Sequence, residues 1–441
     1  MKYITNFSKS DEYRREIHNL IPGGAHTYSK GDDQFPERAP AAIVCGKGAH
    51  VWDLDDNKYL DCSMGLTSVS LGHAYEAVNA AVRRELENGV NFQRPSHLER
   101  KMAETFLGLV PEHQMIKFAK NGSTVTSAAV KLARAFTGRK LVVFPSDHPF
   151  YSYDDWFIGR TVCNKGVPQE YQELTLTFVS TDLSTLEDLF EKYPQQIACV
   201  ISEPEKSHIH DPTYCKRLSE ICKKNGALYI MDEMITGFKT AFPGSIHKYS
   251  GCADLATWGK GIANGFSFCA LTGIKEVMEL GGIRQKGQEK VFLISSTHGG
   301  ETISMAAAIA TAEEFKKNHV VEHNHEIGRL FSERVSDAIS KKHLSDLVGV
   351  VKSEWLPMLT FKDKTGAVCP GMRTLAMQEM IKRGVLFQGI FVPSFSHQKS
   401  DVEFFVEALE ETLDVYAIAL EKGFAGFLVG EPAKPVFRRF L

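Results

Sequence analysis

Short apolar runs alternate with longer stretches of helical spacing from about residue 60 onward. Apolar residues recur at helical intervals over 77–88 and 98–109. The continuous apolar runs occupy residues 141–144, 197–201, 227–231 and 268–271. Such runs are typical of parallel strands whose two faces are both covered by helices. The pattern therefore predicts an α/β fold with one large parallel sheet.

The two ends of the chain show a different pattern. Strand-like runs at 42–45 and 48–55 precede a polar Asp-Asp-Asn turn at 55–57, which predicts a hairpin. From about residue 306 helical spacing dominates, with a short β-rich run at 384–387. We therefore predict an N-terminal arm with part of a small domain over 1–60, a large domain over 61–305 and a C-terminal small domain over 306–441.

The composition is that of an ordinary globular protein, with 43% hydrophobic and 24% charged residues. The net charge of −3 provides no basic field that would attract nucleic acid or an acidic membrane surface. No run of about 18 apolar residues occurs, and the first ten residues lack the apolar core of a secretory signal. Nine scattered cysteines without a Cys-x-x-Cys pair indicate reduced thiols, and the sixteen histidines show no metal-ligand pattern. We therefore expect a cytoplasmic protein without a metal site that binds neither nucleic acid nor membranes.

A turn rich in glycine and hydroxyl groups precedes a strongly helical stretch. The turn reads Asn-Gly-Ser-Thr-Val-Thr over 121–126, and helical spacing follows over 127–136. Free N–H groups and the positive end of the helix dipole at such a helix start can hold a phosphate group. Ser and Thr are also good N-caps of any helix, so simple helix capping is the second interpretation.

Two charged residues follow apolar runs in this part of the chain. Asp232 follows the run at 227–231, and ligands of open α/β sheets collect at the carboxyl ends of parallel strands. Lys260 lies between Gly259 and Gly261, and glycine allows the backbone to approach another group closely. A partly buried lysine has a lowered pKa and is a nucleophile toward carbonyl groups. For each residue alone, an aspartate in a plain turn or a lysine in a surface loop is the alternative.

The order of these features along the chain favours pyridoxal 5′-phosphate as a cofactor. This cofactor needs a lysine that forms an imine with it, a carboxylate that keeps its pyridine nitrogen protonated, and an anchor for its phosphate. The turn at 121–126, Asp232 and Lys260 can supply these groups, and a second hydroxyl-rich turn follows at 295–302. The second turn either completes the phosphate site or caps a helix that begins near Ser304.

On these residues the sequence resembles the class III, or omega-type, aminotransferases of fold type I, in the branch of glutamate-1-semialdehyde aminomutase. The resemblance covers about residues 20 to 420 and rests on motifs at 22–24, 52–57, 71–73, 203–204, 232–238 and 258–260. It implies a large domain with a mostly parallel seven-stranded sheet flanked by helices, together with a smaller α+β domain. It also implies a pyridoxal-phosphate-dependent enzyme that forms a homodimer with its site at the subunit interface.

The resemblance implies a role for each matching position. Lys260 would form the imine with the cofactor and move the substrate proton, and Asp232 would pair with the pyridine nitrogen. Gly122 and Ser123 would bind the phosphate, which Thr297 would reach from the other subunit.

Three further residues are expected around the cofactor ring. Phe150 occupies the position of the aromatic residue that stacks on the ring, and Met234 would pack on the opposite face. Glu203 lies where the family has a glutamate near the hydroxyl edge of the cofactor.

Several positions depart from the aminomutase pattern. The arginine that holds the substrate carboxylate after Pro-Gly-Gly is absent, and Lys30 in that stretch keeps the charge without the bidentate fork. The arginine after Thr-Gly-Phe is Lys239, and the Tyr-His pair is Phe150-Tyr151. The phosphate turn reads Asn-Gly-Ser-Thr where the aminomutases have Ser-Gly-Thr-Glu. These departures count against glutamate 1-semialdehyde as the substrate.

The altered motifs are similar to those of a side branch associated with surface-carbohydrate synthesis. This similarity implies transfer of an amino group from L-glutamate to the aldehyde of a sugar-like acid, with 3,8-dideoxy-8-oxo-octulosonate of lipopolysaccharide synthesis as the favoured acceptor. A hydroxylated acid needs hydrogen-bond donors and a cation. The candidates for this role are His26, Tyr28, Lys30, Tyr151 and Tyr153.

Two alternatives stay open beside this interpretation. An aminomutase would keep the amino group on one carbon skeleton, and the missing arginine counts against it. A cofactor-binding protein without turnover is the other alternative, and the intact pair of Asp232 and Lys260 counts against that one.

Overall fold

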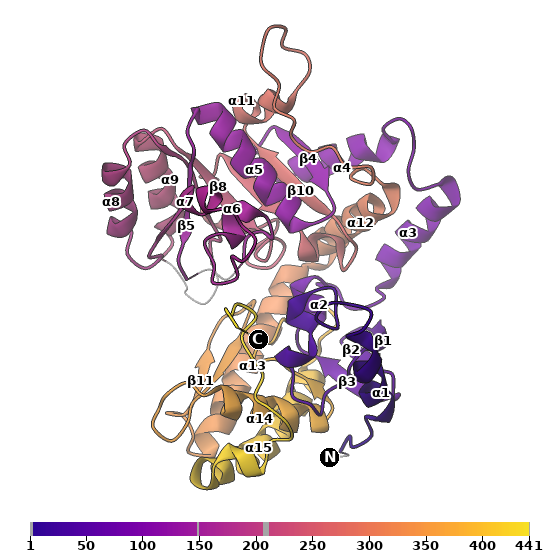
Figure 1. Ribbon diagram of the computed structural model, residues 1–441. Helices are drawn as coiled ribbons and strands as arrows, with labels where there is room; N and C mark the ends of the chain where they lie inside the picture. The colour runs from indigo at the N-terminus through magenta and orange to yellow at the C-terminus, as the bar shows by residue number, and fades with distance from the viewer. Residues whose placement is uncertain (1–2, 148–149, 206–210, 441) are drawn as a thin grey trace. The chain divides into compact units, whose positions relative to one another are not determined.

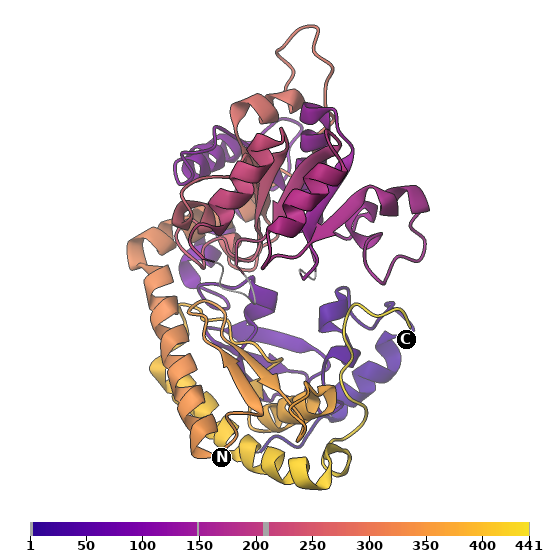
Figure 2. The same ribbon diagram turned by 90° about the vertical axis from the view of Figure 1, so that its left-hand side faces the viewer.

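The computed structural model describes residues 3–147, 150–205 and 211–440. The chain folds into two compact units, both of which are drawn in Figures 1 and 2. Unit 1 contains residues 1–75 and 322–436, and unit 2 contains residues 76–321 and 437–441. Each unit therefore combines segments from distant parts of the sequence.

Unit 2 is built around a seven-stranded sheet with the strand order β4-β10-β9-β8-β7-β5-β6. The strands are β4 (Met115–Ala119), β5 (Leu141–Pro145), β6 (Thr175–Phe178), β7 (Ile197–Ser202), β8 (Leu228–Glu233), β9 (Leu255–Trp258) and β10 (Cys269–Gly273). Neighbouring strands pair in parallel except at β10, which is antiparallel to both β4 and β9. The predicted α/β fold with a mostly parallel sheet is confirmed.

The apolar run at 268–271 differs from the prediction, because it forms most of the antiparallel strand β10. The chain passes from β9 to β10 through residues 259–268, which contain the short 3₁₀ helix η3 (Lys260–Ala263). A parallel neighbour needs a crossover of about a dozen residues or more. This shorter connection therefore returns the chain in the opposite direction, which the apolar run alone does not reveal.

Helices flank the sheet of unit 2. They are α3 (Glu76–Asn88), α4 (His97–Leu107), α5 (Gly122–Thr137), α6 (Asp155–Ile158), α7 (Gln169–Glu173), α8 (Ser184–Lys192), α9 (Tyr214–Lys224), α10 (Ser245–Lys248), α11 (Lys275–Met278), η4 (Glu279–Gly281) and α12 (Thr302–Asn318). Figure 1 shows α5 lying along β4 and β10, with α8 and α9 near the other end of the sheet. Val125, Ala128, Ala129 and Leu132 of α5 are buried at helical spacing, and the small alanines allow α5 to lie close to the strands.

Unit 1 contains a smaller sheet with the strand order β1-β2-β3-β13 and a separate hairpin of β11 and β12. These strands are β1 (Ile43–Lys47), β2 (His50–Asp53), β3 (Lys58–Asp61), β11 (Val348–Val351), β12 (Met358–Phe361) and β13 (Val385–Leu386). The antiparallel pairing of β2 with β3 confirms the predicted hairpin across 55–57. β13 pairs in parallel with β3, so the C-terminal segment completes a sheet begun by the N-terminal one.

Helices surround these strands and enclose an aromatic core. They are α1 (Ser8–Ile17), η1 (Tyr28–Lys30), η2 (Asp32–Gln34), α2 (Met64–Thr67), α13 (Val320–Lys341), α14 (Pro370–Lys382), α15 (Lys399–Lys422) and η5 (Phe424–Gly426). Figure 2 shows the long helix α13, coloured orange, along the outside of the unit 1 strands. In the core, Phe331 stacks on Phe391 at 4.1 Å between ring centres, and Phe405 lies 4.6 Å from Phe331. This is the predicted smaller α+β part of the fold.

Two general features concern the chain as described. Across the described ranges, no helix has the length and apolar character that crossing a membrane requires. The same ranges hold no group of three or more His, Cys, Asp or Glu side chains placed to bind a metal ion. All nine cysteines are free thiols.

Candidate active site

Five strands of unit 2 end at one edge of the sheet, and residues singled out from the sequence lie at or just after each of these ends. β5, β7, β8 and β9 run in parallel, and β4 shares their direction because β10 is antiparallel to both β4 and β9. The residues that follow the five strands are Gly122 and Ser123 after β4, Phe150 after β5, Glu203 after β7, Asp232 at the end of β8, and Lys260 after β9. The carboxyl ends of parallel strands are the usual ligand-binding edge of such a sheet.

The carboxylate of Asp232 is buried and held by two hydrogen bonds. The parallel register places Asp232 beside Thr257 of β9, whose Oγ1 donates to Asp232 Oδ1 at 2.8 Å. The backbone N–H of Met234 donates to the same oxygen at 2.9 Å. Both bonds reach Oδ1, so in the described part of the chain Oδ2 keeps its lone pairs for another partner. A buried carboxylate of this kind fits a protonated ring nitrogen.

The electrostatic environment of Asp232 also fits a cationic partner. Burial raises the pKa of Asp232 to about 6, and the nearby Glu203 carboxylate adds to this rise. The hydrogen bonds from Thr257 and Met234 and the positive charge of Lys260 act in the opposite direction. A pyridinium group at Oδ2 would add a further positive charge and favour the ionised form. On this observation, the residues present fit pyridoxal 5′-phosphate.

Lys260 begins η3 directly after Gly259. Its φ of 49° lies in the left-handed region, which costs a residue with a side chain about 1–2 kcal/mol. Strain of this kind is concentrated at functional sites, where the surrounding structure enforces it. The Lys260 side chain is half-buried, and its charge acts on Asp232 and on the buried side chain of Lys239. The amine therefore shares a buried region with the predicted ring partner.

Met234 lies between the phosphate turn and the lysine loop. A Cβ atom added to Gly259 would lie 2.3 Å from Met234 Sδ, and one added to Gly122 would lie 3.0 Å from Met234 Cε. The two glycines therefore make room for the thioether. Met234 is 9% exposed, and its expected contact with one face of the cofactor ring stays a prediction.

The phosphate turn caps α5 and also leaves amide groups at the helix start. α5 begins at Gly122, five residues before the predicted start, because the side chain of Asn121 accepts the N–H of Thr124 at 2.9 Å. The N–H groups of the first helical turn, including those of Gly122 and Ser123, have no partner within the helix. Ser123 Oγ accepts the backbone N–H of Tyr153 at 3.0 Å, which fixes the turn. Capping and phosphate binding are therefore compatible here.

The two aromatic residues after β5 have different environments. Phe150 is 48% exposed and meets Phe157 edge-on at 5.9 Å, so much of its ring is available for stacking. Tyr151 is 2% exposed, and its ring lies 5.7 Å from Phe157. The Tyr151 hydroxyl accepts the backbone N–H of Glu203 at 3.2 Å. Burial raises the pKa of Tyr151, and the charges of Glu203 and Asp232 raise it further.

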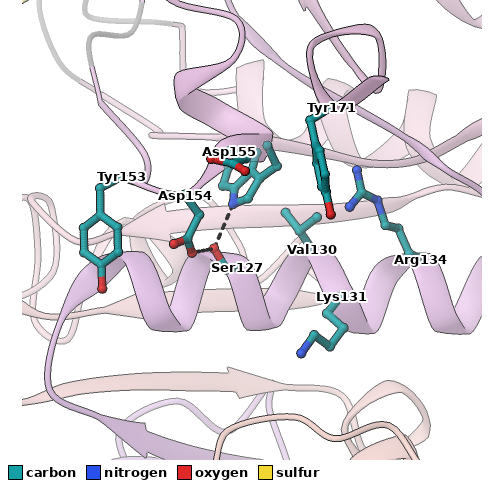
Figure 3. A pocket seen from close by; sticks show the side chains of 9 residues that line it. Ser127, Val130, Lys131, Arg134, Tyr153, Asp154, Asp155 and Tyr171 are labelled. Carbon is teal, nitrogen blue, oxygen red and sulfur yellow. Dashed lines mark hydrogen bonds between the residues drawn. The ribbon is translucent and has the colours of Figure 1, made fainter. Parts of the chain in front are cut away.

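A cavity of about 450 Å³ runs along α5 (Figure 3). It is lined by Ser127, Val130, Lys131, Arg134, Tyr153, Asp154, Asp155, Trp156 and Tyr171. Tyr153 stands at the end next to the phosphate turn, where its hydroxyl lies 3.5 Å from Asn121 Oδ1. Ser127 Oγ accepts Trp156 Nε1–H at 2.8 Å and donates to Asp154. The lining includes neither Lys260 nor Asp232, so this cavity adjoins the candidate site through Tyr153.

The remaining predicted residues lie elsewhere in the chain. His26, Tyr28 and Lys30 belong to unit 1, in or just before η1, and Tyr28 is 69% exposed. Thr297 is exposed and lies in unit 2, in the long loop between η4 and α12. The roles of these four residues toward a site in unit 2 or in a second subunit stay predictions.

Two buried charged residues lie beside the site: Glu233, to which the sequence analysis assigns no role, and Lys239, which it names only as the replacement of an arginine. The Glu233 carboxylate accepts the hydroxyl of Thr236 and, at 2.5 Å, the backbone N–H of Ile246, so it braces the loop after β8. Burial raises the pKa of Glu233 to about 7. Burial lowers the pKa of Lys239 to about 7, and the charge of Lys260 lowers it further. The signal in the sequence that could have identified both residues is the presence of charged residues within the largely apolar stretch 228–239.

Comparison with known proteins assigns the family. The family model described as Aminotransferase class-III matches residues 33–354, a span that includes every unit 2 residue of the candidate site. The chain belongs to the class-III aminotransferase family. Enzymes of this family depend on pyridoxal 5′-phosphate, so the predicted enzyme class and cofactor are confirmed.

Relatives and solved structures agree with this assignment. This class-III aminotransferase is 29% identical to a glutamate-1-semialdehyde 2,1-aminomutase of Sulfurihydrogenibium azorense, over 94% of this chain and 100% of the relative. It is 31% identical to the protein of that name from Thermus thermophilus, over 92% of this chain and 99% of the relative. Its fold is similar to that of the FumI protein of Sphingopyxis sp. MTA144, solved in the pyridoxal-phosphate internal aldimine form, with a TM-score of 0.85 at 23% identity over 97% and 99% of the two chains.

Proposed function

We propose that this class-III aminotransferase moves an amino group from L-glutamate to the aldehyde of a sugar-like acid. The favoured acceptor is 3,8-dideoxy-8-oxo-octulosonate, which would give 8-amino-3,8-dideoxy-octulosonate. The observation that carries the transfer chemistry is the buried Asp232 carboxylate beside Thr257, at the sheet edge where Lys260 follows β9.

The residues at the sheet edge have complementary roles in this proposal. When bound, pyridoxal 5′-phosphate supplies a ring that withdraws electrons from the substrate carbon. Lys260 would bind the aldehyde carbon of the cofactor through its amine and would move the proton at the substrate carbon. Asp232 would hold the proton on the ring nitrogen. The amides of Gly122 and Ser123 would bind the phosphate, and Phe150 and Met234 would restrict the ring from its two faces.

The proposed acceptor rests on the residues that replace the aminomutase pattern. Lys30 supplies a single cationic centre for a carboxylate, without the bidentate geometry of arginine. His26, Tyr28 and Tyr153 add groups that hydrogen-bond to hydroxyls, and Tyr153 is 60% exposed beside the phosphate turn. Tyr151 is the least accessible of the proposed residues, because it is 2% exposed and its hydroxyl accepts the backbone N–H of Glu203. A site that hydrogen-bonds to substrate hydroxyls rejects analogues that lack them, because its own polar groups are then left unpaired.

We also propose that the enzyme is a cytoplasmic homodimer that serves the synthesis of lipopolysaccharide or another surface carbohydrate. The exposed Thr297 supports the dimer, because a residue in that position would be available to a second subunit. The carbohydrate role follows from the proposed acceptor.

A glutamate-1-semialdehyde 2,1-aminomutase activity is the second candidate. The observation in its favour is that two relatives of 29% and 31% identity, aligned over more than nine tenths of this chain, carry that name. An aminomutase returns the amino group to the same carbon skeleton and needs no external donor.

Isotope transfer separates the two candidates. The cofactor-loaded enzyme is incubated with ¹⁵N-labelled L-glutamate and either 3,8-dideoxy-8-oxo-octulosonate or glutamate 1-semialdehyde. The proposal predicts ¹⁵N in the amino sugar acid and an equal amount of 2-oxoglutarate. Isomerisation of glutamate 1-semialdehyde with its own nitrogen retained, and no label in the sugar acid, would overturn the proposal and support the aminomutase.

A further inference from the structure

We propose that Lys120 and Glu301 are positioning residues whose ion pair holds the phosphate turn at 121–126 against the second hydroxyl-rich turn at 295–302. The inference rests on the proposed function, because it assigns these residues to the phosphate end of the same cofactor site. Both residues belong to unit 2.

The ion pair joins two segments that are far apart in sequence. Lys120 lies between the end of β4 and the phosphate turn, and Glu301 lies directly before α12. Lys120 Nζ donates to Glu301 Oε1 and to Ser304 Oγ, and the two charged side chains are 21% and 11% exposed. A largely buried pair is screened much less by salt than a surface pair, and loss of one partner leaves a buried charge uncompensated.

Glu301 also caps the start of α12. It is the N-cap residue of this helix, and its carboxylate accepts the backbone N–H groups of Ile303 at 2.9 Å and Ser304 at 3.2 Å. Burial raises the pKa of Glu301, but the hydrogen bonds from Lys120 and Ser304 and the charge of Lys120 hold it below its ordinary value. The sequence suggested that Ser304 begins this helix, and the structure assigns the cap to Glu301 instead. Lys120 therefore binds Glu301, the residue that caps the start of α12.

The second turn also lies against β4 itself. A Cβ atom added to the buried Gly299 would lie 3.6 Å from the carbonyl oxygen of Phe118. In addition, the carbonyl oxygen of Lys120 accepts the hydroxyl of Ser267 at 2.6 Å. The main chain of Lys120 is thus fixed beside the phosphate turn while its side chain reaches toward α12.

These contacts explain how the Lys120 side chain, which lies outside the phosphate turn, can affect phosphate binding. Asn121 caps α5 and Ser123 Oγ holds Tyr153, so the turn is braced from the side of α5. The ion pair of Lys120 and Glu301 braces it from the side of α12 and the loop that carries Thr297. Partners that orient ligands without touching them change the affinity of metal sites by about 10–100-fold. We expect an effect at the lower end of that range here.

The test compares Lys120→Met, Glu301→Gln and the double variant with the matched control Lys117→Met. Lys117 is an exposed lysine on the same strand. The dissociation constants of pyridoxal 5′-phosphate and of phosphate-free pyridoxal are measured through the absorbance of the lysine imine. Circular dichroism and urea unfolding confirm that each variant is folded.

The expected result has three parts. Lys120→Met and Glu301→Gln each weaken binding of pyridoxal 5′-phosphate about tenfold and leave the affinity for pyridoxal within twofold of wild type. The double variant loses no more than either single variant, because the two residues act as a unit. Lys117→Met behaves as wild type, and Lys120→Arg retains most of the affinity.

Other outcomes overturn the inference in distinguishable ways. If Glu301→Gln binds the cofactor normally while Lys120→Met does not, Lys120 contacts the phosphate directly. Equal losses for pyridoxal and its phosphate mean general damage to the site. A wild-type protein that forms no lysine imine with either compound overturns the proposed function, and the inference falls with it.

Discussion

At the scale of single residues, the fold holds the Asp232 carboxylate in one orientation. Thr257 and Met234 bind one carboxylate oxygen, so the direction of the other oxygen is set by the fold. Dipoles and charges fixed in advance need no reorganisation during a reaction, which is why they are effective. Lys260 is fixed in a comparable way, through a backbone conformation that residues with side chains seldom adopt.

Cofactor binding should weaken as the pH falls through about 6. Burial raises the pKa of Asp232 to about 6 from its ordinary value of 3.8, so the carboxylate is ionised above pH 6 and becomes neutral below it. A neutral carboxyl group cannot provide the negative charge that keeps the ring nitrogen protonated. The dissociation constant of pyridoxal 5′-phosphate is therefore measured between pH 5 and pH 8.

Asp232→Asn isolates the contribution of this carboxyl group to the pH profile. The variant should bind the cofactor more weakly at pH 8, lose most of its turnover, and lose the part of the pH dependence that belongs to Asp232. Wild type and Asp232→Asn with the same pH profile would mean that the ring partner lies elsewhere.

The sequence predicted part of the candidate site, and the limit of that prediction has a physical reason. Asp232 and Lys260 were predicted because each stands at a local boundary between an apolar run and glycine-containing or polar residues. Lys120 and Glu301 were not predicted as a pair, because their contact depends on how β4 and α12 come together. A pairing between distant segments leaves no local pattern in the sequence.

At the scale of elements, strand direction decides which residues meet. The apolar runs predict the strands, but periodicity carries no information on direction, so the prediction that the run in β10 is parallel is wrong. The helix after the phosphate turn was predicted to start at 127, and it starts at Gly122 because Asn121 supplies the cap. Both differences lie next to the candidate site, where turn chemistry competes with regular periodicity.

Gly259→Ala should destabilise the protein by about 1–3 kcal/mol, the usual cost of overpacking a filled interior. The added Cβ would lie 2.3 Å from Met234 Sδ and 2.7 Å from Cys269 Sγ, so both side chains must move. The shift should also displace Lys260 and weaken cofactor binding. Urea unfolding gives the change in the free energy of unfolding.

The matched control for this prediction is Gly426→Ala, because a Cβ at Gly426 meets no atom within 4 Å. Its free energy of unfolding should differ from that of wild type by less than about 0.5 kcal/mol, as is usual for a surface substitution. If Gly259→Ala is as stable as this control, the close packing of Met234 against the lysine loop is incorrect.

At the scale of the whole molecule, the chain divides its predicted site residues between two units. Unit 2 holds the residues proposed for the cofactor together with Tyr151 and Tyr153, and unit 1 holds His26, Tyr28 and Lys30, the other three residues proposed for the substrate. The α/β architecture could be predicted from the alternation of apolar runs and helical spacing. The subunit arrangement could not be predicted from this pattern, because the expected contact of Thr297 with a second subunit rests on the family resemblance.

Hybrid dimers test the proposed contribution of Thr297 to the other subunit. Dimers of Thr297→Ala alone should bind the cofactor weakly, and dimers of Lys260→Ala alone should form no imine. A hybrid with one subunit of each kind should regain one site of wild-type affinity, because Lys260 of one chain then meets Thr297 of the other. The affinity of purified hybrids is measured from the imine absorbance. Hybrids that bind as weakly as the Thr297→Ala dimer would place Thr297 in the site of its own chain.

The most direct test of the whole account is the absorption spectrum of the purified protein before and after addition of L-glutamate. We expect wild type and the exposed-lysine control Lys275→Ala to show the lysine-imine band, and L-glutamate to remove it with release of an equal amount of 2-oxoglutarate. Lys260→Ala should bind the cofactor without that band. A band that persists in Lys260→Ala, or a wild-type band that L-glutamate leaves unchanged, would contradict the account.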